Sequence, residues 1–188
     1  MFLLLPMLVR TRRQYPNARP HLVVVGSDMY AEVKFEERHC DGVIEALNDK
    51  SRWEKSQATP TERYAVSKLL THYMAYEIAR LTPIINGEPA VNVNIVGPGF
   101  CKSELMTHEP GRLYLLEAMQ FLTVRTSEEG SKTIVDGAVR GVESHGEYIE
   151  HQKFATVENL VSPDEGLKLK NKIWHEMLDV LIPAVPAV

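Results

Sequence analysis

Two short apolar runs constrain the fold of this chain most strongly: HLVVVG at 21–26 and AVNVNIVG at 90–97. Both are rich in valine and end in glycine, which is typical of strands that are buried on both faces of a parallel sheet. Between them, residues 61–81 carry apolar side chains at helical spacing, which predicts one long helix. A strand, a helix and a strand in this order predict a right-handed parallel crossover unit.

The remaining segments predict further helices and one more strand. Expected elements are a short helix near 40–49, a helical stretch at about 112–124, a strand at 146–151, and a terminal amphipathic helix followed by an irregular tail at about 182–188. Thr126 and Glu129 have the spacing of a capping box, so a helix is expected to begin there. Together these elements predict an α/β fold, a parallel sheet with flanking helices, in a single domain that spans 1–188.

The N-terminal stretch MFLLLPMLVRTRR, residues 1–13, is apolar at first and ends in arginines. No basic residue precedes its apolar part, no small-residue cleavage site follows it, and the run is too short to span a bilayer. It is therefore interpreted as the end of a buried helix. No polar residue caps the start of this helix, so the sequence is expected to begin inside the helix. The fold is therefore expected to be truncated at its N-terminus.

Charge and cysteine content exclude several classes of partner. The chain has 188 residues and a net charge of −4, and its basic residues are scattered, so neither nucleic acid nor a membrane surface is expected to bind it. Cys40 and Cys101 are far apart and no Asn-x-Ser/Thr sequence occurs, which favours a reducing, cytoplasmic location. The histidines, such as His145 and His151, show no metal-ligand spacing, so no metal site is expected.

Tyr64 and Lys68 lie four positions apart in the predicted helix 61–81, so their side chains project from the same helix face. A phenol ordinarily ionises only near pH ~10, and a neighbouring ammonium favours the phenolate, which makes a tyrosine a usable acid and base. A bare Tyr-x-x-x-Lys match is more often an ordinary helix surface. The neighbouring segments therefore decide how this pair is interpreted.

Three segments in this order resemble the short-chain dehydrogenase/reductase family. LVVVGSDMY resembles the family's strand that ends at a catalytic serine, RYAVSKL resembles its Tyr-x-x-x-Lys helix, and VNVNIVGPGFCKSEL resembles the next strand with its Pro-Gly loop. The likeness extends from residue 1 to about 180. It implies a Rossmann-like sheet with flanking helices.

The resemblance also implies a role for each matched residue. Tyr64 would protonate a carbonyl oxygen or deprotonate an alcohol, while Lys68 would favour the phenolate and hold the ribose of NADP or NAD. Ser27 would donate a hydrogen bond to the substrate oxygen. Pro98, Gly99 and Ser103 would line the bound cofactor.

Some of these residues have simpler interpretations. Ser27 followed by Asp28 could be a turn at the end of a strand. The segment between Ser27 and Tyr64 is longer than is usual in the family, so an inserted loop is expected, either shaping a substrate site or forming solvated surface. Cys101 is interpreted as a loop or packing cysteine, because no histidine lies at an interpretable spacing from it.

The chain lacks the strand, glycine-rich turn and helix with which family members begin and which bind the cofactor pyrophosphate. The sequence is therefore compatible with two alternative functions. The first is an oxidoreductase that transfers hydride between NADP(H) or NAD(H) and a carbonyl or alcohol of a small apolar molecule, similar to fungal members of secondary metabolism. The alternative is a non-redox descendant, either an isomerase or cyclase that uses Tyr64 as acid and base or a catalytically silent binding protein.

Loss of the neighbouring strands would expose an edge of the apolar run 21–26, which is an aggregation hazard. A homo-oligomer, or a partner that covers this edge, is therefore expected. The substrate, the choice between NADP and NAD and the direction of the reaction are left open by the sequence.

Overall fold

The structure is a computed structural model that describes residues 1–32, 34–55, 59–101, 125–156 and 163–184. The chain divides into two compact units. The first comprises Met1–Asp28 and Ile78–Thr156, and the second comprises Met29–Glu77 and Val157–Val188. The single domain expected over 1–188 stays a prediction.

The first unit contains a four-stranded sheet with the order β1-β4-β5-β6. These strands are β1 (His21–Val25), β4 (Asn92–Gly97), β5 (Tyr148–Glu150) and β6 (Lys153–Ala155). β1 and β4 are parallel, with Val25 opposite Val96, and β4 and β5 are also parallel, whereas β5 and β6 are antiparallel. The two predicted strands on either side of the long helix thus pair in parallel, and the α/β, Rossmann-like arrangement is confirmed with a mixed sheet.

The two predicted strands differ in burial. All six residues of β4 are buried, as predicted. In β1, Leu22 and Val24 are buried, but Val25 is 42% exposed and the burial alternates along the strand. The expectation that 21–26 is buried on both faces is therefore wrong. The reason is that, among the described residues, the face of β1 that carries His21, Val23 and Val25 is only partly covered.

Two buried asparagines, Asn92 and Asn94, interrupt the apolar sequence of β4. The Asn92 side-chain amide donates to Gly141 O at 2.8 Å and to Ser144 Oγ at 2.9 Å. The Asn94 amide donates to the same Ser144 oxygen at 3.1 Å. These bonds tie the central strand to the 3-10 turn η4 (Val142–Ser144), which explains why a buried strand tolerates polar side chains.

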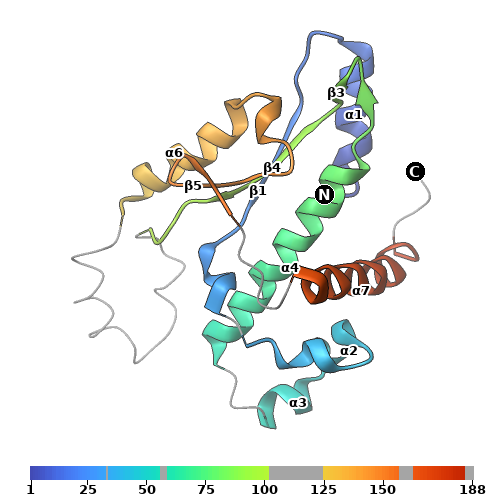
Figure 1. The fold of residues 1–188 in the computed structure, drawn as a ribbon, viewed down its shortest axis with the longest axis vertical. Coiled ribbons are helices and arrows are strands. Elements are labelled where there is room, and N and C mark those ends of the chain that lie inside the picture. The colour runs from blue at the N-terminus through green and yellow to red at the C-terminus, as the bar shows by residue number, and fades with distance from the viewer. Residues whose placement is uncertain (33, 56–58, 102–124, 157–162, 185–188) are drawn as a thin grey trace. The chain divides into compact units, whose positions relative to one another are not determined.

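Helix α6 (Ser127–Val139) lies along one face of the sheet (Figure 1). Its N-terminus confirms the predicted capping box, because Thr126 Oγ1 accepts from Glu129 N at 3.1 Å and Glu129 Oε2 accepts from Thr126 N at 3.3 Å. The helix approaches the sheet closely at Gly137, where an added side-chain carbon would lie 2.5 Å from Val96 Cγ1. Glycine at this position therefore sets the distance between helix and sheet.

The N-terminal helix α1 (Leu4–Gln14) corrects one expectation. It was expected to be buried, but Leu4 is 50% and Met7 56% exposed. Its buried residue is Arg12, whose Nη2 lies 3.4 Å from Glu88 Oε2. The buried side chain of this helix is thus a charged one, and its Nη1 also donates to the carbonyl oxygen of Ala18 at 2.9 Å.

A small hairpin next to α1 was not predicted (Figure 1). It pairs β2 (Ile84–Ile85) with β3 (Glu88–Pro89) in antiparallel register. The turn residues Asn86 and Gly87 both have positive φ angles, of 54° and 81°. Asn-Gly is the preferred sequence for such a tight turn, so the signal was present in the sequence.

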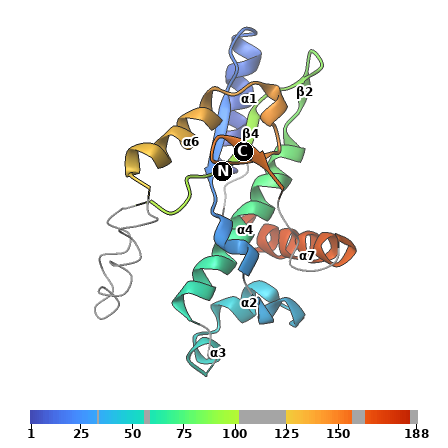
Figure 2. The same ribbon diagram turned by 60° about the vertical axis from the view of Figure 1, so that its left-hand side comes forward.

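The second unit is helical (Figure 2). Its elements are η1 (Asp28–Glu32), η2 (Glu36–His39), α2 (Val43–Asn48), α3 (Lys50–Lys55), most of α4 (Pro60–Leu81), and α7 (Pro163–Leu181). The first residue of η1, Asp28, belongs to the first unit. Glu176 Oε2 of α7 accepts from Ile44 N at the start of α2, at 2.8 Å, so the last helix caps the short one.

Three helices of this unit agree with the sequence-based expectations near 40–49, at 61–81 and at the C-terminus. The helical stretch expected at about 112–124 and the last residues of the tail lie outside the described residues. None of the described helices combines the length and apolar content that a membrane crossing requires.

Candidate functional site

Tyr64 and Lys68 lie one turn apart on α4, as the sequence predicted. Lys68 Nζ is 5.5 Å from the centroid of the Tyr64 ring, which is within the range of a cation–π contact. Both side chains are half-buried. The two side chains therefore have an arrangement suited to proton exchange at a tyrosine, with an ammonium on the same helix face as the phenol.

Helix α4 carries a further tyrosine, Tyr73, in a different environment. Tyr73 is 7% exposed, and burial raises the pKa of its hydroxyl. Burial therefore disfavours the phenolate form of Tyr73, which a tyrosine that acts as acid and base must adopt. Tyr64 is therefore the better candidate on this helix.

Ser27 and Pro98 follow neighbouring strands at the same edge of the sheet. The ladder between β1 and β4 continues to that edge, because Gly26 N donates to Val96 O at 2.8 Å. Ligands of α/β sheets bind at the carboxyl ends of the strands, where both residues lie. Ser27 is half-buried and its Oγ donates to Asp28 Oδ1 at 3.3 Å, a bond that a turn residue would also make.

The loop after β4 is held in place by its own contacts. Gly99 has a φ of +74°, a conformation that favours glycine. Cys101 Sγ donates to the carbonyl oxygen of Pro98 at 3.3 Å, and the cysteine is half-buried. The contact agrees with the interpretation of Cys101 as a loop or packing cysteine.

The structure brings the expected site residues together in two groups. Tyr64 and Lys68 share one face of α4 in the second unit, and Ser27 lies with the Pro98–Gly99 loop at the sheet edge of the first unit. Ser103 lies outside the described residues. The roles assigned to these residues stay predictions.

Sequence reasoning missed two side chains at the Gly99 loop. A side-chain carbon built on Gly99 would lie 3.3 Å from His151 Cε1 and 3.8 Å from Arg125 Cδ. Both residues come from distant parts of the sequence, and no local pattern identifies them. Only the hairpin β5–β6 and the start of α6, once placed beside β4, bring them to this loop.

The packing role of a half-buried histidine was also missed. His145 Nδ1 accepts from Val93 N at 3.1 Å, and its Nε2 lies 3.2 Å from the carbonyl oxygen of Ala79. Burial lowers the pKa of this imidazole, while the Ala79 carbonyl opposes that shift. His145 is thus held neutral and links β4 to the end of α4 within the first unit.

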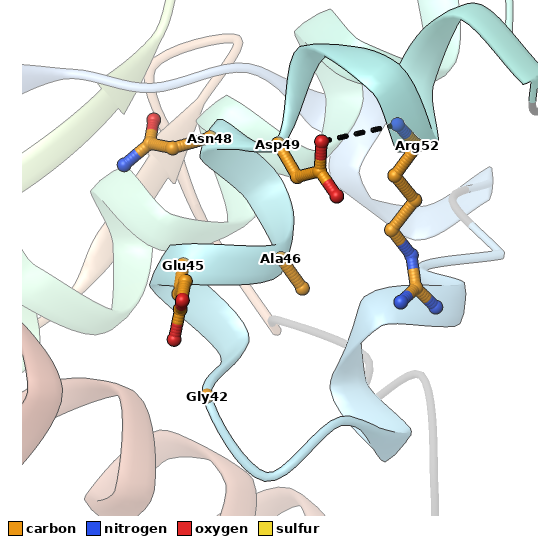
Figure 3. A pocket seen from close by; sticks show the side chains of 6 residues that line it. All are labelled: Gly42, Glu45, Ala46, Asn48, Asp49 and Arg52. Carbon is orange, nitrogen blue, oxygen red and sulfur yellow. Dashed lines mark hydrogen bonds between the residues drawn. The ribbon is translucent and has the colours of Figure 1, made fainter.

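An open pocket in the second unit does not coincide with any expected site residue (Figure 3). It is lined by Gly42, Glu45, Ala46, Asn48, Asp49 and Arg52. Hydrogen bonds from the Ser51 hydroxyl and the Arg52 backbone lower the pKa of the Asp49 carboxyl. Asp49 is therefore engaged as the cap of α3. In the described part of the chain, no group of three or more histidine, cysteine or acidic side chains could hold a metal ion.

Comparison with curated proteins finds relatives along nearly the whole chain. It is 30% identical over 188 residues to a short chain dehydrogenase/reductase of Cryptosporiopsis sp., an alignment that covers 99% of this chain and 56% of that protein. It is 29% identical over 173 residues to a short chain dehydrogenase of Gibberella zeae, covering 92% of this chain and 49% of that protein.

A third relative is more similar over a shorter stretch. A short chain dehydrogenase of Emericella nidulans is 36% identical over 137 residues, which cover 71% of this chain and 41% of that protein. The chain therefore spans about half the length of the curated relatives it matches. No family model and no solved structure matches it.

Proposed function

The chain belongs to the short-chain dehydrogenase/reductase family, and we propose that it carries the proton-transfer residues of a hydride-transfer reaction between a nicotinamide dinucleotide and a small carbonyl compound or alcohol. The observation that carries this proposal is the Lys68 ammonium at 5.5 Å from the Tyr64 ring centroid. The relatives named above are all dehydrogenases or reductases, which favours this function over an isomerase, a cyclase or a silent binding protein.

Each of the three residues has a distinct role in the proposed reaction. Tyr64 donates its hydroxyl proton to the substrate oxygen when a carbonyl is reduced, and takes a proton back when an alcohol is oxidised. Lys68 stabilises the phenolate that remains on Tyr64. Ser27 donates a hydrogen bond to the substrate oxygen, where negative charge develops.

The described residues fit one end of a nicotinamide cofactor. Gly99 places a backbone without a side chain at the carboxyl edge of the sheet, where the nicotinamide would lie against Pro98 and Gly99. The family resemblance adds Ser103, which lies outside the described residues. Lys68 and Tyr64 would hold the ribose hydroxyls, since both can donate hydrogen bonds. When bound, NADP or NAD donates or accepts the hydride.

The substrate and assembly are proposed more broadly. The substrate is a small apolar molecule of secondary metabolism, as the sequence resemblance implies. The position of β1 at the end of the sheet, with Val25 42% exposed, supports a second copy or another partner that covers this edge. The absence of glycosylation sequences and of closely spaced cysteines supports a cytoplasmic location.

The test is an assay of NADPH and NADH consumption with a panel of small ketones and aldehydes. Tyr64→Phe removes one hydroxyl and is expected to abolish turnover, because no other group at this position can donate the proton. Tyr73→Phe removes a hydroxyl from the same helix and is the matched control, expected to keep wild-type turnover. Circular dichroism of both variants confirms that the fold is intact.

Turnover of Tyr64→Phe at a rate near the wild type would contradict the proposed role of Tyr64. Because the chain alone is expected to bind the nucleotide weakly, the assay supplies each nucleotide at a saturating concentration. Failure of the wild-type protein to consume either nucleotide under these conditions, with any member of the panel, would contradict the proposed reaction itself.

A further inference from the structure

Arg125 and His151 meet over the backbone of Gly99 in the first unit. A side-chain carbon built on Gly99 would lie 3.3 Å from His151 Cε1, 3.8 Å from His151 Nδ1 and 3.8 Å from Arg125 Cδ. Both side chains therefore flank the loop that follows β4, at the sheet edge where Ser27 also lies. Neither residue belongs to the proton-transfer set.

Arg125 is fixed at this place by its backbone. Its N–H donates to Phe100 O at 3.1 Å, and it forms a parallel bridge with Cys101. The side chain is half-buried, and among the ion pairs of the described residues the Arg125 guanidinium has no carboxylate partner. A half-buried guanidinium that is anchored but unpaired is a candidate to bind an anion from solution.

His151 is fixed by the turn between β5 and β6. Its φ of 52° and that of Gln152, 61°, set the two-residue turn of the hairpin. Its Nε2 lies 3.7 Å from Glu150 Oε1, which orients the ring. Cε1 and Nδ1 are the imidazole atoms that lie nearest to Gly99. An N–H donor at Nδ1 would therefore lie beside the loop that the Arg125 side chain also approaches.

The start of α6 lies against the same loop. A side-chain carbon on Gly130, in the first turns of the helix, would lie 3.4 Å from the carbonyl oxygen of Pro98. The N-terminal end of a helix carries partial positive charge, which adds to that of Arg125. The nearest acidic side chain of the helix, Glu129, is engaged in the capping box with Thr126.

We propose that Arg125 and His151 form an anion-binding subsite that holds a carboxylate or phosphate group of the ligand at the sheet edge formed by β1 and β4. Arg125 supplies a fixed charge with several N–H donors, and His151 supplies a further donor from the opposite side of the loop. Because Gly99 has no side chain, both side chains can approach its backbone closely. This inference rests on the proposed function only for the statement that a ligand binds at this edge.

The test measures binding of two defined probes, inorganic pyrophosphate and succinate, to the chain itself. Backbone amide shifts of Gly99, Cys101 and His151 in two-dimensional NMR report binding at this place. Loss of one charge-assisted contact is expected to weaken the affinity at least about tenfold in Arg125→Gln and in His151→Gln. Arg125→Lys, which keeps the charge, is expected to retain most of the binding.

Arg13→Gln is the matched control, because Arg13 is an exposed arginine of the same unit and its loss changes the net charge equally. Preference for pyrophosphate would assign the subsite to a phosphate group, and preference for succinate would assign it to a carboxylate. If Arg125→Gln fails to fold by circular dichroism, the titration of His151→Gln decides, since His151 has a side chain that is 47% exposed.

Equal affinity of the Arg125→Gln and Arg13→Gln variants for both probes would overturn the proposal, and so would the absence of saturable shifts at the loop in the wild type. The titration measures no hydride transfer. Its outcome is therefore independent of whether Tyr64 performs the proposed proton transfer.

Discussion

Lys68 Nζ lies 5.5 Å from the centroid of the Tyr64 ring, one helical turn along α4. The contact places a fixed positive charge beside the phenol. Lys68→Met keeps most of the length of the side chain but removes this charge. Turnover is expected to fall by roughly 100-fold or more, which is the usual contribution of an acid or base catalyst. Steady-state kinetics of the variant measure the loss.

Lys132→Met is the control for this change, because Lys132 is exposed on α6 and its loss alters the net charge equally. It is expected to keep wild-type turnover. Unchanged activity of Lys68→Met would show that the contact belongs to an ordinary helix surface.

His145 predicts how stability depends on pH. Burial holds the pKa of this imidazole below its usual 6.5, and its Nδ1 accepts from Val93 N, a bond that protonation would break. The unfolded chain therefore binds the proton more readily than the folded one, and the free energy of unfolding is expected to fall as pH drops below about 6.5. Urea unfolding at several pH values between about 5 and 8 measures this dependence.

His145→Asn removes the titrating group and is expected to flatten the dependence on pH, at a cost in stability. His39→Asn changes an exposed histidine and should leave the slope as in the wild type. A slope that is the same in all three proteins would assign the pH dependence to other groups.

The second unit depends on an ion pair with little exposure to solvent. Lys170 Nζ lies 3.0 Å from Glu77 Oε1, and the two side chains are 18% and 9% exposed. Lys170→Met leaves the Glu77 carboxylate without this partner, which is expected to cost about 2–4 kcal/mol of unfolding free energy. Lys168→Met, at an exposed position of the same helix, should change it by less than about 0.5 kcal/mol. Similar losses in both variants would contradict the importance of the pair.

Local signals in the sequence predicted much of the fold. The valine-rich runs gave both strands of the parallel pair, and the spacing of Thr126 and Glu129 gave the start of α6. The hairpin at Asn86-Gly87 also had a local signal, which the sequence analysis did not use. Such features depend on residues that are close in the sequence, so they can be predicted before the fold is known.

Contacts between distant segments could not be predicted in this way. His145 joins Val93 and Ala79 only after the chain has folded. The approach of Arg125 and His151 to Gly99 likewise depends on how α6 and the β5–β6 hairpin pack beside β4. The apolar start of α1 was misleading because the buried residue of this helix is Arg12 and not an apolar side chain.

The approach of α6 to the sheet gives a steric prediction. A side-chain carbon at Gly137 would lie 2.5 Å from Val96 Cγ1 and 3.2 Å from Asn94 Oδ1. Although alanine is the better helix former, Gly137→Ala must displace the helix, and we expect a loss of about 1–3 kcal/mol of unfolding free energy. Lys132→Ala, on the exposed face of α6, should be neutral or slightly stabilising. If denaturant unfolding gives Gly137→Ala and Lys132→Ala the same free energy of unfolding, the result would contradict the close packing of α6 on the sheet.

Cofactor binding by this chain alone should be weak, for a reason that lies in the sequence. The family resemblance implies that a glycine-rich turn binds the pyrophosphate, yet the only Gly-x-Gly here is Gly97-Pro98-Gly99 after β4. Each missing charge-assisted hydrogen bond to a phosphate is worth about 1.5–3 kcal/mol, so several together weaken binding by orders of magnitude. We therefore expect no NADPH binding tighter than about millimolar in calorimetry.

Lys68→Met serves as the control in this titration, because any weak binding that involves the ribose contact should weaken further in the variant. Micromolar affinity of the wild-type chain for NADPH would contradict the expectation, since it would require phosphate contacts from residues other than a glycine-rich turn. Arg125 and His151 would then be the first side chains to test, because they already flank the loop at Gly99 and can donate hydrogen bonds to phosphate oxygens.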